Sequence, residues 1–223
     1  MIYRFQFKEV FPPDDVLGEW IVTLAMAFND LALVHVRLEE DSEDGARFLY
    51  WLRVALGHFN ESANFLHNTA QIEQVEQFLA SLSSQAREHY EAFMALSEGG
   101  RGTLARLRST TAFHYPELRV VEGMKKPRTV QRVLRALAAR NDVGLIEKGD
   151  SGTVREGRLL FADEVVAVLV TEASGGADAI EEVHREISEA IREFMRFTNH
   201  ALDAYFATVV EGGVRFDSVA ERP

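Results

Sequence analysis

The chain has 223 residues, of which 47% are hydrophobic and 26% charged, and these proportions exclude a disordered or collagen-like protein. It contains no cysteine, which excludes disulfides, thiolate metal sites and a cysteine nucleophile. Its formal net charge of −11 argues against a general nucleic-acid binder. The length predicts one domain that spans residues 1–223.

The N-terminal part of the chain predicts a short strand and then a long helix. Apolar and polar residues alternate from Tyr3 to Lys8, which is typical of a half-buried strand, and two prolines end this pattern. Asp14 or Asp15 can cap the helix that follows, and His35 falls on its apolar stripe. The other residues of that stripe are Leu17, Ile21, Leu24, Phe28, Leu31 and Leu38.

A second long helix is predicted after an acidic turn at residues 39–44, and it runs to about Asn68. A short connection between two such helices favours an antiparallel hairpin. Its expected buried residues are Leu49, Leu52, Leu56, Phe59, Ala63 and Leu66. Shorter helices are predicted at 71–82, 85–96 and 103–112.

The strongest helical pattern lies near the C-terminus, over residues 178–210. Before it, residues 129–140 predict an amphipathic helix, and the glycine-rich stretch 143–162 predicts a small β-hairpin. We therefore expect a mostly α protein, an up-and-down bundle with long N- and C-terminal helices and this one hairpin excursion.

No run of 18 apolar residues and no signal-peptide pattern occurs in the sequence. We therefore expect a cytoplasmic protein with no membrane partner.

Charge is distributed unevenly along the chain. Residues 101–140 contain ten bases and two acids, a net charge of +8, so the remaining 183 residues carry −19. A local basic surface on an acidic protein can hold phosphates through arginine and lysine, while the acidic remainder of the protein repels a polyanion. The alternative is that these bases pair with acidic residues of the same chain or of a second subunit.

The basic segment also contains Arg108 and His114, separated by five residues at a predicted helix end. An Arg-x(4–6)-His motif in a small helical bundle resembles the HEPN superfamily, many of whose members are metal-independent ribonucleases in toxin, anti-phage and RNA-processing systems. Members often have a polar residue such as asparagine after the arginine, where this chain has Ser109. The sequence does not identify a partner antitoxin.

The resemblance implies an endoribonuclease with Arg108 and His114 as the catalytic pair and with no metal or other cofactor. Histidine can transfer protons near neutral pH, and the arginine fork can hold phosphate oxygens. Positions six apart on a helix point about 120° away from each other, so a homodimer is expected to assemble the site from two chains. Residues expected to bind the RNA substrate are Ser109, Tyr115, Arg119, Lys125, Lys126 and Arg128.

Two other functions remain open. His114 continues the helical spacing of Leu104, Leu107 and Thr111, so it can instead be a core histidine. The protein would then be a non-catalytic interaction protein that dimerises through its long C-terminal helix. Alternatively, residues 127–161 resemble the recognition helix and wing of a winged-helix DNA-binding domain, with arginines on the exposed face of the helix. The exposed arginines would be Arg128, Arg132 and Arg135.

The sequence contains two further polar groups. An antiparallel hairpin brings Asn29 and Asp30 near His58 and Glu61, where a buried hydrogen-bond network is the favoured interpretation over a metal or ligand site. A single Glu-x-x-His at Glu181 matches only half of a di-iron signature, so no metal site is expected there. The pattern assigns no ligand-like neighbours to His67, His89 or His200.

Overall fold

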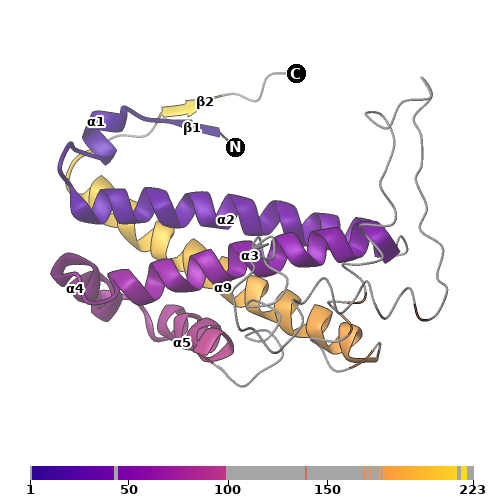
Figure 1. Ribbon diagram of the computed structural model, residues 1–223. Helices are drawn as coiled ribbons and strands as arrows, with labels where there is room; N and C mark the ends of the chain where they lie inside the picture. Colours follow the sequence, from indigo (N-terminus) through magenta and orange to yellow (C-terminus); the bar gives the residue numbers. More distant parts are fainter. Residues whose placement is uncertain are drawn as a thin grey trace, which may run out of the picture. The chain divides into compact units, whose positions relative to one another are not determined.

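A computed structural model describes residues 2–42, 45–98, 178–214 and 217–219, together with the single positions 139, 168, 171 and 176. This part of the chain is mostly helical, which confirms the predicted class (Figure 1). Three predicted elements lie outside the described residues: the β-hairpin at 143–162 and the helices at 103–112 and 129–140. Of the last helix, only Ala139 is described. The elements are β1 (Ile2–Arg4), α1 (Phe7–Val10), α2 (Val16–Glu40), α3 (Gly45–Thr69), α4 (Glu73–Ser81), α5 (Ser84–Glu98), α9 (Asp178–Glu211) and β2 (Asp217–Val219).

The chain forms two compact units, each described separately below. The first contains Met1–Ala32, Glu61–Leu96 and Glu189–Pro223, and the second contains Leu33–Asn60 and Ser97–Ser188. Because α2, α3 and α9 each contribute residues to both units, neither unit corresponds to one continuous stretch of sequence.

In the first unit, the two ends of the chain pair as a small antiparallel sheet, with Ile2 opposite Val219 and Arg4 opposite Asp217. The strand is therefore shorter than the alternating pattern from Tyr3 to Lys8 predicts, because a helical turn begins at Phe7. Aromatic packing accounts for the change: the Phe5 ring lies 5.3 Å from that of Phe7 and 6.4 Å from that of Phe206, between ring centroids.

The start of α2 shows the predicted aspartate cap. Asp15 Oδ1 accepts a hydrogen bond from the backbone N–H of Leu17 at 3.1 Å, which satisfies one of the free donors of the first turn. Gly18 is required here by close packing, since a Cβ atom at this position would lie 2.7 Å from Asp15 Oδ2 and 3.2 Å from the Tyr205 hydroxyl. The cap and the C-terminal helix thus meet at one point.

The antiparallel pairing of α2 with α3 is confirmed in the first unit. Trp20, near the beginning of α2, donates through Nε1 to Thr69 Oγ1 at 2.8 Å, and Thr69 is the last residue of α3. The Trp20 ring also stacks on Phe65 and meets Phe78 of α4 edge-on. This indole therefore joins three helices.

Helix α5 packs antiparallel to α9 in the same unit. The Phe93 and Phe194 rings lie 5.0 Å apart and the Tyr90 and Phe197 rings 5.1 Å apart, so the residue number rises on one helix as it falls on the other. Phe93, Phe194 and Phe197 are completely buried. These aromatic rings form the centre of the α5–α9 contact.

In the second unit, the turn between α2 and α3 is held by Asp41. Its carboxylate accepts a hydrogen bond from Trp51 Nε1 at 2.9 Å and lies 3.7 Å from the Arg47 guanidinium. Further along, the Phe48 ring meets the imidazole of His184 edge-on, with 5.0 Å between centroids. This contact places α3 against the first turns of α9.

The buried residues follow most of the predicted stripes. In α2, Leu17 and Phe28 remain half-exposed, and in α3 Leu49 does. The predicted residues of α2 and α3 that are buried are Ile21, Leu24, Leu31, Leu38, Leu52, Leu56, Phe59, Ala63 and Leu66. In α9 the apolar residues Val183, Ile187, Ile191, Phe194 and Tyr205 are buried.

Helix α2 is also long and apolar enough to cross a bilayer, a test that it alone meets among the described helices. Core helices of soluble proteins pass the same test by length and composition, and α2 carries a buried stripe. The cytoplasmic location therefore stays a prediction.

Candidate functional site

The catalytic pair predicted from the sequence, Arg108 and His114, lies outside the described residues. The same is true of the predicted RNA-binding residues, which are Ser109, Tyr115, Arg119, Lys125, Lys126 and Arg128. The winged-helix interpretation of 127–161 depends on the same part of the chain. Within the described residues, another group of titratable side chains comes together.

This group, the α5–α9 histidine cluster, consists of His89, Glu193, Arg196 and His200. The Glu193 carboxylate lies between two partners: one oxygen is 2.6 Å from His89 Nδ1, and the other accepts a hydrogen bond from Arg196 at 2.7 Å. The His200 ring stacks on that of His89, with 5.8 Å between centroids and 11° between planes. His89 and Glu193 are each more than four-fifths buried, at 18% and 15% side-chain exposure.

The helix geometry explains how α9 supplies three of these residues. Glu193, Arg196 and His200 are three and then four positions apart, which places them on one face over two turns. His89 reaches that face from α5 because the antiparallel contact sets Tyr90 against Phe197, the residue after Arg196. The aromatic packing therefore positions the polar cluster beside it.

The contact with Glu193 determines which nitrogen of His89 is available for chemistry. When the imidazole is neutral, Nδ1 carries the proton and donates it to the carboxylate, which leaves Nε2 as the basic atom. A carboxylate that orients a histidine in this way is common in proton-transfer and metal sites. The arrangement can therefore accept or donate a proton at His89 Nε2.

We expect His89 to be the Nδ1–H tautomer in the wild-type protein, and Glu193→Ala to shift it toward Nε2–H because the acceptor for Nδ1–H is lost. Long-range ¹H–¹⁵N NMR correlations of the imidazole measure this ratio. Glu189→Ala, an exposed glutamate one turn earlier on α9, is the control and should leave the ratio unchanged. An unchanged ratio in Glu193→Ala would show that the carboxylate does not orient the ring.

The described residues do not give this cluster the arrangement of a metal site. Within the described ranges, no three histidine or carboxylate side chains are placed so that they could hold a metal ion. The stacked, nearly parallel rings of His89 and His200 explain this, because nitrogens in parallel planes do not converge on one ion.

The pattern of the sequence assigns His89 and His200 no partners, and the structure gives them one another and Glu193. The sequence could have shown that Glu193, Arg196 and His200 share one face of α9, because their spacing is three and four residues. It could not have shown that His89 joins them, because residues 89 and 193 are brought together only by the packing of two helices.

The polar group considered in the first hairpin differs from its expected form. Asn29, Asp30 and Glu61 are exposed, so the expected burial of these three side chains is wrong. His58 alone among the four is half-buried. The helical positions explain this exposure: Asn29 lies on the side of α2 opposite the buried Leu31 and Val34, and Asp30 lies at the edge of that buried stripe.

Glu181 and His184 lie in different surroundings. Glu181 is exposed, whereas the Nε2 atom of His184 is buried and has no hydrogen-bond partner among the described residues. One turn further, the buried hydroxyl of Ser188 also lacks a partner in the described part of the chain. The apolar ring of Phe48 covers the imidazole instead, so this part of α9 is a packing surface.

Comparison with known proteins adds no relative: the chain matches no family model, and no similar curated protein or solved structure is found.

Proposed function

We propose that the protein binds RNA through its basic segment and cleaves it without a metal ion, acting as a dimer. The observation that carries the proposal is the segregation of charge: residues 101–140 hold ten bases and two acids in a chain whose net charge is −11. Arginine and lysine contacts to phosphates dominate the affinity of proteins for nucleic acids. The helical class of the described residues is compatible with the HEPN resemblance of the Arg108–His114 motif.

The proposed reaction uses the 2′-hydroxyl of the RNA as the nucleophile. Its oxygen forms a bond to the adjacent phosphorus while the bond from phosphorus to the 5′-oxygen breaks, leaving a 2′,3′-cyclic phosphate and a 5′-hydroxyl. One histidine takes the proton of the 2′-hydroxyl or gives a proton to the leaving oxygen. Arg108 stabilises the charge that develops on the phosphate oxygens. In a site built from two chains, the His114 of one chain would make these proton transfers beside the Arg108 of the other.

The test is cleavage of single-stranded RNA in the presence of EDTA. We expect activity in the wild-type protein, and a loss of about 10²–10⁴-fold in both Arg108→Ala and His114→Ala, because each removes a group used in the transition state. Matched controls are His67→Ala and Arg192→Ala, which replace exposed residues of the same types on α3 and α9. Circular dichroism verifies that each variant remains folded.

A third variant separates two locations for the acid–base group. His89→Gln removes the imidazole of the α5–α9 histidine cluster, and we expect it to retain cleavage. If His89→Gln is inactive while His114→Ala is active, the reaction belongs to the cluster and the motif assignment is wrong. Cleavage that disappears in EDTA and returns with a divalent cation would contradict a metal-independent mechanism.

The dimer can be tested with the same variants. Mixing Arg108→Ala with His114→Ala should restore about a quarter of the wild-type activity if each site takes its arginine from one chain and its histidine from the other, since half the dimers are mixed and each has one intact site. Activity that stays at the level of the single variants would contradict a shared site. Sedimentation at the assay concentration measures whether dimers are present.

A second candidate function is a non-catalytic interaction protein. Helix α2 favours it, because Met26, Leu33 and Val36 are large apolar residues exposed at helical spacing. This function predicts no RNA cleavage and no duplex binding. Binding of duplex DNA that falls steeply with salt, and that weakens when Arg132 and Arg135 are replaced, would instead support the winged-helix interpretation.

A further inference from the structure

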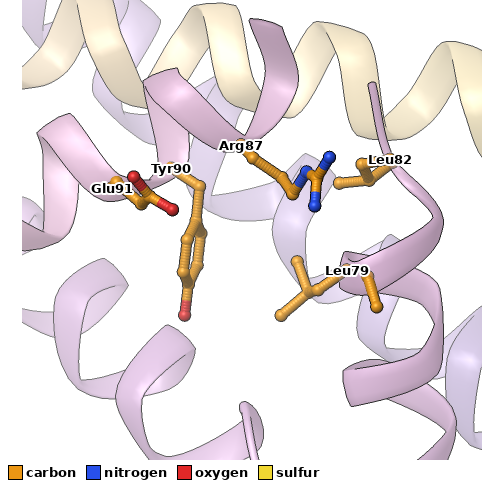
Figure 2. Close-up of a pocket in the computed structure, with 6 residues that line it drawn as sticks. Leu79, Leu82, Arg87, Tyr90 and Glu91 are labelled. Atoms are coloured by element: carbon orange, nitrogen blue, oxygen red, sulfur yellow. The ribbon is translucent and has the colours of Figure 1, made fainter. Parts of the chain in front are cut away.

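A small pocket lies at the corner between α4 and α5, within the first unit, and has a volume of about 210 Å³ (Figure 2). It arises because α4 ends at Ser81 and α5 begins at Ser84, so two helices diverge from a two-residue connection. Leu82 in that connection has an extended backbone and a buried side chain. The lining residues are Leu79, Ala80, Leu82, Arg87, Tyr90 and Glu91.

The walls of the pocket are apolar on one side and aromatic on the other. Leu79 comes from α4 and Leu82 from the connection, whereas the Tyr90 ring comes from α5 and points across the opening (Figure 2). The Tyr90 ring also packs against the core, 5.1 Å from the ring of Phe197. Such walls bind a flat or branched hydrocarbon body.

Two charged side chains lie on opposite flanks of Tyr90. The guanidinium of Arg87 lies near Leu79 and Leu82, and the carboxylate of Glu91 lies on the other side of the ring (Figure 2). Although they are four residues apart on α5, the two do not form an ion pair, and within the described ranges Arg87 has no acidic partner at all. An unpaired guanidinium beside an apolar wall is suited to a carboxylate that has an apolar body.

We propose that this pocket binds a small apolar monocarboxylate, with its carboxylate on Arg87 and its hydrocarbon body between Tyr90 and Leu79. The volume is that of about seven water molecules, which matches a phenyl ring with a short chain and not a long lipid. Glu91 on the far flank repels a second negative charge and therefore favours one carboxylate over two. This site is independent of RNA cleavage.

The probe for the test is 4-phenylbutyrate, titrated into the ¹⁵N-labelled full-length protein. We expect shifts at the backbone amides of α4 and α5 around the pocket and a dissociation constant of about 1 mM, typical of a ligand of this size. Arg87→Gln should weaken binding about tenfold or more, because a charge-assisted contact is lost. Glu91→Gln should strengthen it.

The matched control is Arg192→Gln, which removes an exposed arginine of α9 that also has no acidic partner among the described residues, and it should leave binding unchanged. The neutral analogue 4-phenylbutanamide should bind at least tenfold more weakly than the acid. Equal binding of amide and acid, an unaffected Arg87→Gln variant, shifts confined to other helices, or no shifts up to about 10 mM probe would each overturn the proposal.

Discussion

Phe194→Ala is expected to lower the free energy of unfolding by about 3–5 kcal/mol, a large effect for one residue. The Phe194 ring has no exposed surface and lies 5.0 Å from Phe93, which is also fully buried. Removing it takes away apolar burial and leaves a cavity that two rigid, antiparallel helices cannot close by a small movement. Urea denaturation followed by circular dichroism measures the difference.

A conservative variant and an exposed control make this test specific. Phe194→Leu keeps most of the volume, so it should cost clearly less than Phe194→Ala. Phe7→Ala removes the same atoms from a side chain that is 71% exposed, and it should change stability by less than about 1 kcal/mol. If Phe194→Ala unfolds at the same urea concentration as the wild type, the α5–α9 contact is not a core.

Tyr205→Phe is expected to destabilise the protein by about 1–3 kcal/mol at neutral pH, and this difference should disappear at alkaline pH. The Tyr205 hydroxyl donates to the backbone carbonyl of Val10 at 2.7 Å and lies 3.3 Å from Asp15 Oδ2. Burial raises the pKa of Tyr205 to about 12, and the nearby charge of Asp15 and its hydrogen bond add to this. The fold therefore favours the neutral phenol.

The direction of the pH effect follows from the raised pKa. Because the folded-state value of about 12 exceeds the unfolded value of 10.0, the contribution of Tyr205 is fully present below pH 10 and is lost between pH 10 and 12. Over that range the unfolded tyrosine ionises while the folded one does not. The stability gap between the wild type and Tyr205→Phe should narrow accordingly.

Urea unfolding at pH 7, 9, 10 and 11 measures that gap. Tyr50→Phe is the control, since Tyr50 is 46% exposed and should show no comparable narrowing. Gly18→Ala tests the contact between Asp15 and Tyr205 from the side of α2, because the added Cβ would lie 2.7 Å from Asp15 Oδ2. A gap between wild type and Tyr205→Phe that is constant from pH 7 to 11 would contradict the role assigned to the hydroxyl.

Helix α9 illustrates how much of the fold was predictable. Its apolar residues repeat at three-and-four spacing across residues 178–210, and the structure has a helix from Asp178 to Glu211. A long periodic pattern predicts a helix well because every turn repeats the same spacing of apolar residues. The strand at the N-terminus was less predictable, since Phe5 and Phe7 alternate like strand residues but pack in an aromatic cluster with Phe206, about 200 positions away.

The candidate sites show the same difference between patterns that are local in sequence and contacts that are not. Arg108 and His114 can be named because the motif is local in sequence, and they lie outside the described residues. The histidine cluster depends on a contact between residues 89 and 193, and the pocket on a short turn that separates two helices. Neither follows from spacing within a single helix.

The sequence by itself determined the helical class, the bounds of the long helices to within a few residues, an aspartate cap at Asp14 or Asp15 and the separation of basic from acidic residues. These properties depend on neighbours within a turn or two, or on composition alone. Only the tertiary structure decided that His89 contacts Glu193 and His200, and that the Tyr205 hydroxyl donates a hydrogen bond to the carbonyl of Val10. Those contacts join residues more than 100 positions apart, and the packing of whole helices, to which every buried side chain contributes, selects them.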